Sequence, residues 1–362
     1  MVLVLLNMAM PASFALAQWV PATCADTDAE CASKAGQQHF AKKIEFWKQA
    51  LILPVEKRVA VAPPELVDFL RLDNIAQSIP NKPRAPVLAE DFVREVMAAF
   101  DELPQSVKSQ LTTKLVGIYF IEDIGGTGFT DVVVDSSGKE VAGFVVLDPS
   151  VLLQQTANGW ATWKENTPFK PSTEFRLTAE IEEESQNTRK NAIQYILLHE
   201  LAHVISIGGN VHPSWNVEPR DIASLLPYRY FRLSWTRSKD RSGYVSLFDE
   251  AFPQRKDVVY YFGARLAANT MAATYESLER TNFVTLYGAT RPGDDFAEAF
   301  ASYVHSVTMK RPFLIHIYQN GKQVKSFDAC WSLPRCADKR QLIEQLLEAK
   351  VTVNQSTPPF GK

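Results

Sequence analysis

The sequence has few histidines, few cysteines and no strong excess of either charge. Of its 362 residues, six are histidine and four are cysteine, and the formal net charge is -3. This near-neutral balance gives no general attraction to nucleic acid or to an anionic membrane surface, so we expect neither as a partner. Hydrophobic residues make up 46% and charged residues 22% of the chain, which excludes general disorder and predicts a globular protein.

The N-terminal apolar run is too short to be a convincing membrane span. Residues 1–17, MVLVLLNMAMPASFALA, combine this run with small residues that end at Ala17. The pattern is typical of a secretory signal peptide, although the basic residues that normally precede the apolar run are missing. Cys24 comes too late for lipidation at the cleavage site. We therefore expect an exported protein, periplasmic or secreted, with a buried N-terminal helix as the alternative.

The four cysteines form two close pairs along the chain, Cys24 with Cys31 and Cys330 with Cys336. In an oxidising compartment such pairs form local disulfides. Three pairings are possible in principle, and the local one is the simplest. The alternative is a zinc site built from all four thiols, but both spacings are wider than those of the usual zinc knuckle.

The first part of the mature chain, residues 18–112, has a mainly helical pattern. Helices are predicted over 34–52, 63–72, 89–102 and 105–114, and 81–87 reads as an extended connector. Three roles are open for this region: a pro-segment, a substrate platform, or a part of one continuous fold.

Residues 113–350 have a mixed pattern, and we expect them to form an α+β domain followed by a flexible tail at 351–362. Three runs rich in β-branched and aromatic residues predict an antiparallel series of strands, and a further strand, a hairpin with an Asn-Gly turn and two later helices follow. The strands are expected at 114–123, 128–135, 139–148 and 173–182, the hairpin at 312–327, and the helices at 266–280 and 336–350. Residues 228–252 mix aromatic and basic residues and read as an insertion that packs its aromatic side chains on the core, with binding of nucleic acid or a cell-surface glycan as the alternative.

The segment LLHELAHVIS places His199 and His203 four residues apart on a helix predicted from about Asn187 to Ile207. Residues i and i+4 share one helix face, so both imidazoles can reach a single cation at roughly 2.0 to 2.1 Å. Glu200 projects about 100° round the helix, where it can act on a metal-bound water without being a ligand. The pattern predicts a zinc hydrolase. The alternative, two core histidines bound to backbone carbonyls, would be a costly way to build a core.

Zinc needs a third protein ligand if its fourth position is to hold water. Gly209 stands where a third histidine would complete the longer form of the motif, and His212 comes three residues too late for that geometry. His212 is therefore a weak ligand candidate, and its plain interpretation is a polar loop residue.

Better candidates for the third ligand lie in a helix predicted after the R-P-G turn at 291–293. Asp294 and Glu298 are four residues apart and share a face, so one can ligate zinc while the other hydrogen-bonds a ligating histidine. The alternative is structural, because Asp295 to Glu298 has the D-x-x-E pattern of a capping box and acids stabilise a helix N-terminus.

Together, HELAH and the segment YGATRPGDDFAEAF resemble the gluzincin metallopeptidases, most closely the branch that contains anthrax lethal factor and the Pro-Pro endopeptidases. The resemblance covers about a tenth of the chain and implies a zincin-like fold that holds one zinc ion. It implies His199 and His203 as ligands and Glu200 as the general base.

The same resemblance gives Asp294 the place of the third ligand and Glu298 that of the acid behind a ligating histidine. Tyr287, seven residues before Asp294, takes the place of the tyrosine that stabilises the oxyanion. The family has glutamate where this chain has Asp294, which is one methylene shorter, so Glu298 is the alternative ligand. The alternative for Tyr287 is an aromatic side chain that packs on the motif helix.

We therefore expect a zinc metalloendopeptidase that hydrolyses peptide or protein substrates, with an edge strand beside the motif helix to pair with the extended substrate. The strand candidates are 140–148 and 175–182. Two other functions stay open: a catalytically inactive binding protein on a zincin scaffold, and a zinc amidase that acts on cell-wall cross-links. Cleavage specificity and oligomeric state do not follow from the sequence.

Overall fold

The structure is a computed structural model, and it describes residues 23–349 except 154, 215–221 and 241–242. The signal peptide predicted at 1–17 and the tail predicted at 351–362 lie outside these residues.

The described part of the chain has an α+β fold, as the sequence predicts. Its α-helices are α1 (Ala29–Gln38), α2 (Ile44–Ile52), α3 (Pro64–Ala76), α4 (Glu90–Asp101), α5 (Gln105–Leu111), α6 (Pro149–Leu152), α7 (Ala157–Asn166), α8 (Arg189–Ser206), α9 (Met271–Glu279), α10 (Pro292–Tyr303) and α11 (Ala337–Glu348). Its strands are β1 (Val59–Val61), β2 (Leu115–Phe120), β3 (Gly128–Val134), β4 (Glu140–Leu147), β5 (Phe175–Glu180), β6 (Trp235–Arg237), β7 (Tyr244–Ser246), β8 (Leu314–Gln319) and β9 (Lys322–Asp328).

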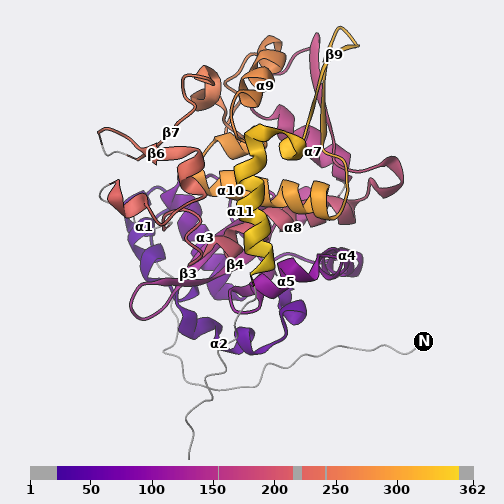
Figure 1. The fold of residues 1–362 in the computed structure, drawn as a ribbon. Helices are drawn as coiled ribbons and strands as arrows, with labels where there is room; N and C mark the ends of the chain where they lie inside the picture. Colours follow the sequence, from indigo (N-terminus) through magenta and orange to yellow (C-terminus); the bar gives the residue numbers. More distant parts are fainter. Residues whose placement is uncertain (1–22, 154, 215–221, 241–242, 350–362) are drawn as a thin grey trace, which may run out of the picture.

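Helix α8 lies in the middle of the molecule. In Figure 1 the indigo and purple N-terminal elements occupy the lower half of the view, and the orange and yellow C-terminal elements lie above them. Helix α8 contacts β3, β4 and α4 from the first half of the chain and α10 from the second half. Because α8 carries the HELAH segment, this segment sits where the two halves meet.

The largest sheet has the strand order β1-β2-β4-β3, which differs from the antiparallel series predicted for 114–148. Strand β2 pairs in parallel with both β1 and β4, and only β3 and β4 are antiparallel. The strand positions are right, but the expected pairing of β2 with β3 is wrong. The chain between these strands does not form a tight hairpin: the Asp148 carboxylate, beyond the end of β4, accepts hydrogen bonds from the backbone N–H groups of Asp123 and Ile124 at 2.8 and 3.2 Å. The chain that leaves β2 therefore passes the end of β4, and β3 pairs with the edge of β4 that faces away from β2.

A second sheet has the order β5-β8-β9 and is antiparallel throughout. The predicted hairpin is confirmed: Asn320 and Gly321 join β8 and β9 with φ angles of 50° and 78°, which favour this pair of residues in a two-residue turn. Neither predicted substrate strand has the expected position. Residues 140–147 form the inner strand β4. Residues 175–180 form β5, which is an edge strand, but of the second sheet, and its main helix contact is with α7; the edge strand that contacts α8 is β3.

Most helix predictions are confirmed, with one interruption. The helix predicted over 34–52 divides into α1, a short 3-10 turn at Phe40–Lys42, and α2. His39 has an extended backbone, with ψ at 147°, and its Nδ1 accepts a hydrogen bond from the Ala41 N–H at 3.2 Å. The apolar residues keep a helical spacing through His39, but the extended backbone of this residue ends α1, and its side chain caps the 3-10 turn that follows.

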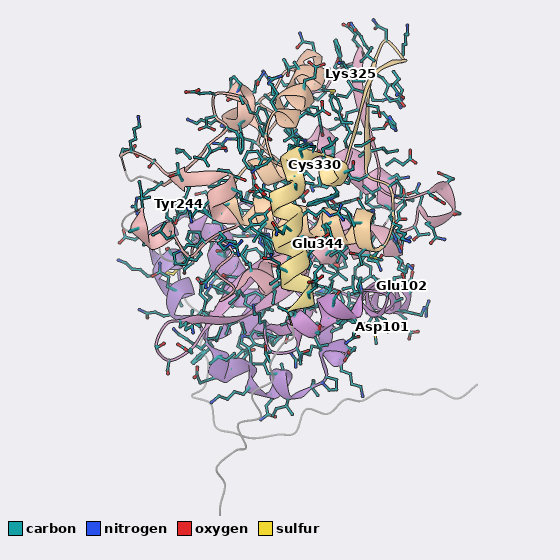
Figure 2. The ribbon with its side chains drawn as sticks, viewed as in Figure 1. Asp101, Glu102, Tyr244, Lys325, Cys330 and Glu344 are labelled. Atoms are coloured by element: carbon teal, nitrogen blue, oxygen red, sulfur yellow. A yellow bond between two sulfur atoms is a disulfide. The ribbon has the colours of Figure 1, made fainter. Side chains whose placement is uncertain are left out.

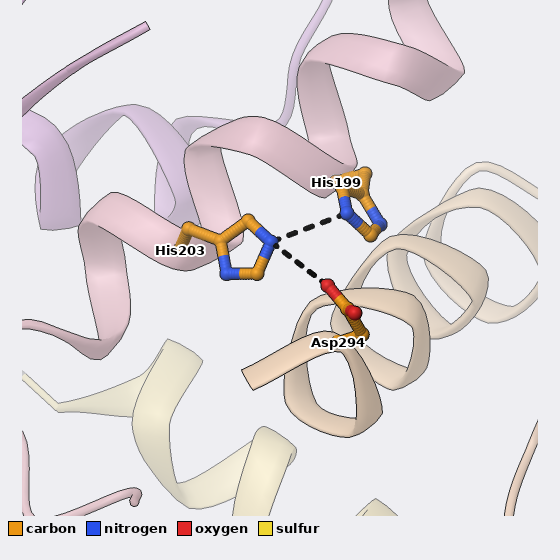
Figure 3. Close-up of side chains that lie close together, drawn as sticks. All are labelled: His199, His203 and Asp294. Atoms are coloured by element: carbon orange, nitrogen blue, oxygen red, sulfur yellow. Dashed lines mark hydrogen bonds and ion pairs between the residues drawn. The ribbon is translucent and has the colours of Figure 1, made fainter. Parts of the chain in front are cut away.

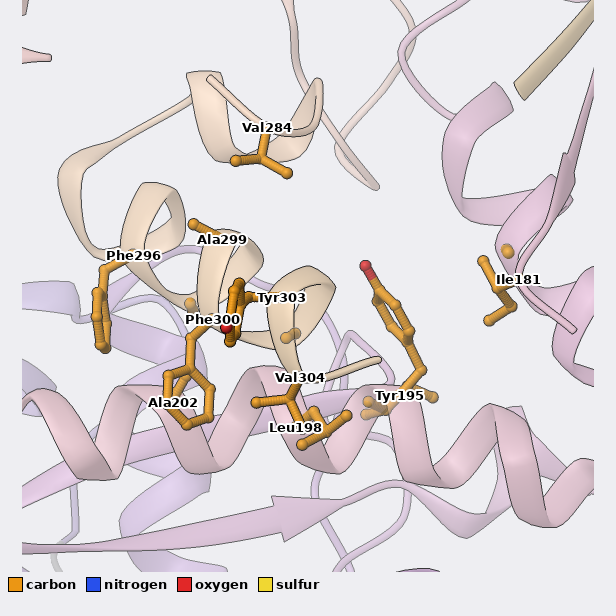
Figure 4. Packing of buried hydrophobic residues seen from close by; sticks show 14 of the residues in the cluster. Ile181, Tyr195, Leu198, Ala202, Val284, Phe296, Ala299, Phe300, Tyr303 and Val304 are labelled. Atoms are coloured by element: carbon orange, nitrogen blue, oxygen red, sulfur yellow. The ribbon is translucent and has the colours of Figure 1, made fainter. Parts of the chain in front are cut away.

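The contact between α8 and α10 is apolar and fully buried. Figure 4 shows Leu198 and Ala202 of α8 below Phe300 of α10 and Val304, which directly follows α10. All four side chains are completely buried. Burying a large apolar side chain stabilises a fold by about 1.5 to 3 kcal/mol. This contact therefore fixes the relative position of the two helices that carry the candidate site.

Both predicted disulfides are present. Cys24 pairs with Cys31 and Cys330 with Cys336, at Cα–Cα distances of 5.7 and 5.9 Å. No cysteine is left free, so the alternative of a four-thiol zinc site is wrong. In Figure 2 Cys330 lies near the N-terminal end of α11, and Glu344 lies further along this helix. Across the described ranges, none of the helices has the length and apolar character needed to cross a membrane.

Candidate metal centre

Three side chains from α8 and α10 converge on one point. His203 Nε2 lies 3.2 Å from His199 Nε2 and 3.6 Å from Asp294 Oδ1. Figure 3 shows both imidazoles projecting from one helix toward the carboxylate on the facing helix. One potential ligand atom from each residue lies within 4.8 Å of the other two, and all three residues are buried. This group can hold a metal ion.

Two of the three distances between these atoms are close to those expected around a tetrahedral ion. Ligand atoms at about 2.0 to 2.2 Å from a tetrahedral centre lie about 3.3 to 3.6 Å from one another. The observed 3.2 and 3.6 Å are close to these values. Two imidazole nitrogens and one carboxylate oxygen are a donor set that suits a zinc-like divalent ion and leaves a fourth position open.

Glu298 lies on the other side of His199, away from His203. Its Oε1 is 2.9 Å from His199 Nδ1 and accepts a hydrogen bond from Lys164 Nζ at 2.7 Å, and its Oε2 accepts one from Thr285 Oγ1 at 2.8 Å. Both oxygens are therefore engaged. Burial acts to lower the pKa of His199, but the hydrogen bond to Glu298 and the charge of that carboxylate raise it above its ordinary value. A metal ion bound at Nε2 would take the place of the proton there, and His199 would keep the Nδ1–H that faces Glu298. The structure thus places Asp294 beside both histidines and Glu298 behind His199.

The protonation states in this cluster follow from burial and charge. Burial acts to raise the pKa of Glu298, but the charge of Lys164 and the hydrogen bond from His199 lower it below its ordinary value. Burial, helped by the charge of His199, lowers the pKa of His203 well below its ordinary value, so this imidazole is neutral. A neutral histidine is the form that ligates a metal. Burial raises the pKa of Asp294, while Arg291, whose Nε lies 3.1 Å from Asp294 Oδ2, opposes this effect.

Glu200 is held beside the ligands by strand β3. Its Oε2 accepts a hydrogen bond from Thr130 Oγ1 at 2.6 Å. Gly128, at the start of the same strand, lies against the carboxylate so closely that a Cβ there would be 2.6 Å from Oε1. Burial raises the pKa of Glu200, opposed by the charge of His199 and by Thr130. A carboxylate with a raised pKa that lines a cleft has the properties of a general base.

Tyr287 lies over one of the ligands. It opens the 3-10 turn Tyr287–Ala289 before α10, and its ring stacks on His199 with centroids 5.5 Å apart and planes at 21°. Lys164 Nζ lies 4.8 Å from the centroid of the Tyr287 ring. Burial raises the pKa of Tyr287 well above its ordinary value, so the phenol keeps its proton and can donate a hydrogen bond. It both packs on the motif helix and borders the cleft.

The remaining sequence candidates lie outside the ligand group. His212 Nε2 is 3.0 Å from Ser206 Oγ, and its Nδ1 is 2.9 Å from the Pro213 carbonyl. The capping-box interpretation of Asp295 and Glu298 is wrong, because α10 begins after Arg291 without a side-chain cap. Asp295 instead pairs with the buried Lys339 of α11 and accepts a hydrogen bond from the Trp235 indole at 3.0 Å.

The sequence analysis missed three residues that support the centre: Lys164, Thr130 and Thr285. Thr130 and Lys164 act on carboxylates 70 and 134 residues away, and Thr285 lies 13 residues before Glu298, so helical or strand spacing does not indicate these contacts. Lys164 alone gives a weak signal, because it shares a helix face with the apolar Trp160 and Ala161. A lysine on an apolar face needs a buried counter-charge, which here is Glu298.

The centre opens into a cleft of about 650 Å³. Its walls come from α1 and α3, from the 124–131 segment that leads into β3, from α8 and α10, and from residues 261–262. The N-terminal helical region thus forms one wall of the cleft, and the edge strand β3 forms another. A cleft of this size is in the range of pockets that enclose small ligands or segments of a chain.

Comparison of the chain with protein-family models, with curated proteins and with solved structures finds no match. The functional assignment therefore depends on the residues of the site and their arrangement.

Proposed function

We propose that the protein is an exported zinc-dependent metallopeptidase of the gluzincin type, with a zincin-like catalytic fold. The observation that carries the proposal is the convergence of His199, His203 and Asp294 from two packed helices, with Glu200 next to them in the cleft. Two histidines and one carboxylate with an open fourth position are a common ligand set of catalytic zinc. The two disulfides agree with export to an oxidising compartment, periplasmic or extracellular.

The shorter side chain of Asp294 is compatible with the position of its helix. Gly293 precedes it, and a Cβ at this glycine would lie only 3.8 Å from His203 Cε1. The first turn of α10 therefore approaches α8 closely, and an aspartate reaches the histidines where a more distant helix would need a glutamate.

Each residue then has a defined role. Zinc, when bound, supplies Lewis-acid chemistry, which lowers the pKa of a coordinated water and polarises a carbonyl oxygen. His199, His203 and Asp294 hold the ion, and Glu298 keeps the proton of His199 on Nδ1. Glu200, oriented by Thr130, accepts the proton of the attacking water and passes it to the leaving amine. Tyr287 donates a hydrogen bond to the oxygen on which negative charge develops.

An extended peptide suits the shape of the cleft. Strand β3 is the edge of its sheet and borders the cleft beside Glu200, so its backbone groups are placed to pair with the main chain of a substrate. This mode of binding recognises the peptide backbone and leaves side-chain preference to the other walls.

The proposal is tested by measuring metal content and peptide cleavage on the same samples. The purified chain is stripped with a chelator, reloaded with zinc, analysed by mass spectrometry and incubated with a mixed peptide library. We expect one zinc per chain and cleavage that the chelator abolishes. His199→Ala and Asp294→Ala should lose the zinc. Glu200→Gln should keep it but lose cleavage by about 10²- to 10⁴-fold. The matched control is His316→Ala, since His316 lies on β8 in the second sheet.

One result would contradict the peptidase, and two others would change the roles of its residues. Stoichiometric zinc without cleavage of any peptide would favour the binding protein, or the amidase if cell-wall fragments are cut instead. Cleavage that survives Glu200→Gln would remove the general base from the mechanism. Zinc retained in Asp294→Ala but lost in Glu298→Ala would exchange the roles of the two acids.

A further inference from the structure

The turn at Tyr260–Gly263 has a strained backbone at the border of the cleft. The Phe262 N–H donates a hydrogen bond to the Tyr260 carbonyl at 2.8 Å, and Tyr261 between them has a φ of 67°. This combination defines a γ-turn of the rare, strained kind. Such a conformation at a bulky residue persists only where the surrounding structure enforces it, and it is concentrated at functional sites.

Buried contacts on both sides of the turn enforce it. The Tyr260 hydroxyl donates to Glu165 Oε2 at 2.8 Å, and the Tyr275 hydroxyl donates to the same oxygen at 2.7 Å. Glu165 lies on α7 and is only 4% exposed. The ring of Tyr260 also packs against Tyr287, with centroids 4.7 Å apart. Tyr260 is therefore fixed in the core, and the chain must turn sharply to send the next side chain toward the cleft.

The ring of Tyr261 is held between α7 and the metal centre. Its centroid lies 5.6 Å from that of Trp163 on α7 and 6.1 Å from that of Tyr287, which it meets nearly at a right angle. Tyr261 lines the cleft, and its hydroxyl makes no hydrogen bond within the described residues. Burial raises its pKa well above the ordinary value, and the charges of nearby carboxylates, including Glu200 and Asp294, add to this effect. The phenol therefore keeps its proton and is available as a donor.

The next residue gives the turn an apolar surface. Phe262 also lines the cleft, and 64% of its surface is exposed. A large apolar side chain exposed beside a polar centre is a typical element of a binding site. The turn thus presents one hydrogen-bond donor and one apolar ring next to each other.

We propose that this turn binds the substrate: the Tyr261 hydroxyl donates a hydrogen bond to a main-chain carbonyl of the peptide, and Phe262 forms the wall of a subsite for an apolar side chain beside the scissile bond. The inference rests on the proposed peptidase function. A donor is what the cleft needs at this point, since Glu200, Asp294 and the other carboxylates around it can only accept hydrogen bonds when ionised. The buried contacts of Tyr260 with Glu165 and Tyr287 hold the turn in place, and so keep both side chains at the rim in the absence of substrate.

The test separates the hydroxyl from the ring. Tyr261→Phe removes only the hydroxyl, Phe262→Ala removes the exposed ring, and Tyr318→Phe on β8 is the matched control for loss of a phenol. Val87→Ala is the control for loss of an exposed apolar side chain, because Val87 is 97% exposed. Each variant is measured on a pair of peptides that carry either leucine or serine next to the bond that the wild-type protein cleaves in a mixed library.

We expect Tyr261→Phe to lower kcat/KM by about 10- to 100-fold on both peptides, the effect of one hydrogen bond in a desolvated site. The wild-type protein should prefer the leucine peptide by roughly 10- to 200-fold, and Phe262→Ala should reduce this preference to within a few fold. Zinc content and the midpoint of denaturant unfolding should stay at the wild-type values in both variants, which a purely structural role of the turn would not allow.

Wild-type kcat/KM in Tyr261→Phe would overturn the role of the hydroxyl, and an unchanged leucine preference in Phe262→Ala would overturn the subsite wall. Either result, with the wild-type protein active, leaves the peptidase proposal standing. A zinc-loaded wild-type protein that cleaves no peptide in the library would overturn both proposals.

Discussion

The contact between Gly128 and Glu200 makes a quantitative prediction for one added methyl group. In Gly128→Ala the new Cβ would lie 2.6 Å from Glu200 Oε1, and ordinary contact begins at 3.4 Å, so the two must separate by about 0.8 Å. Thr130, two residues along the same strand, holds the other carboxylate oxygen at 2.6 Å. The carboxylate therefore has to rotate or lose this hydrogen bond, and either movement takes it away from the position that the proposed mechanism requires.

A misplacement of about 1 Å in a reacting group can lower a rate by about 10²-fold, so we expect a decrease in kcat/KM of this order. The crowding should also lower the free energy of unfolding by about 1 to 3 kcal/mol. Zinc content should not change, because the three atoms nearest to the new Cβ all belong to Glu200 and none belongs to a candidate ligand. The assays are peptide cleavage, metal analysis and denaturant unfolding of the same preparations.

Gly126→Ala is the matched control. It adds the same methyl group two residues earlier, where the nearest atom, the Gly128 carbonyl oxygen, is at an ordinary 3.7 Å. This variant should keep kcat/KM within about 2-fold. The reasoning is refuted if Gly128→Ala keeps wild-type kcat/KM, or if both variants lose activity equally. Loss of zinc in Gly128→Ala would show that the damage reaches the ligands.

Three further predictions concern charge and metal. Lys164→Met should lower the free energy of unfolding by about 3 to 5 kcal/mol, because it leaves the Glu298 carboxylate buried without its counter-charge. The double variant with Glu298→Gln should regain part of this loss. A decrease below about 1 kcal/mol in denaturant unfolding would contradict an ionised pair. Burial, together with the charge of Asp131, raises the pKa of Asp73 from 3.8 to about 6, so the native state binds more protons than the unfolded state between these values. The free energy of unfolding should therefore fall by up to about 3 kcal/mol as the pH rises from 4 to 7. If the free energy of unfolding of Asp73→Asn falls by the same amount over this range, the effect belongs to other groups. Removing zinc should lower Tm, and adding zinc at about 100 times its Kd should raise the free energy of unfolding by about 2.7 kcal/mol. An identical Tm with and without zinc would exclude binding to the native state.

The parts of the structure that follow from local pattern could be predicted from the sequence. Helix α8 is one example, since its apolar spacing, its polar start at Thr188 and the glycines after it all lie within about twenty residues. The i and i+4 relation of His199 and His203 is a property of any helix, so the sequence places both imidazoles on one face. Strand positions at 115–147 follow in the same way from runs of β-branched residues.

Features that depend on distant contacts could not be predicted in this way. The pairing of β2 with β4 depends on where the chain after β2 is anchored, which the carboxylate of Asp148 decides. The choice between Asp294 and Glu298 is a second case, since both acids share one helix face. What distinguishes them is Lys164, 134 residues before Glu298, which engages that acid and leaves Asp294 for the histidines. A contact at such a separation has no signature in local spacing.

The pairing of β1 with β2 has a consequence for how the protein can be cut or shortened. Strand β1 belongs to the helical N-terminal region, yet it is an edge strand of the largest sheet and pairs with the edge of β2. Arg58, just before it, adds hydrogen bonds to the carbonyls of Thr112 and Leu115 at 3.0 and 2.5 Å. A recombinant chain that starts at residue 113 would expose the bare edge of β2 and the apolar side chains under α3, and an uncovered strand edge of this kind recruits other chains into aggregates. We therefore expect that a soluble recombinant protein requires the N-terminal helices and the candidate site on one polypeptide.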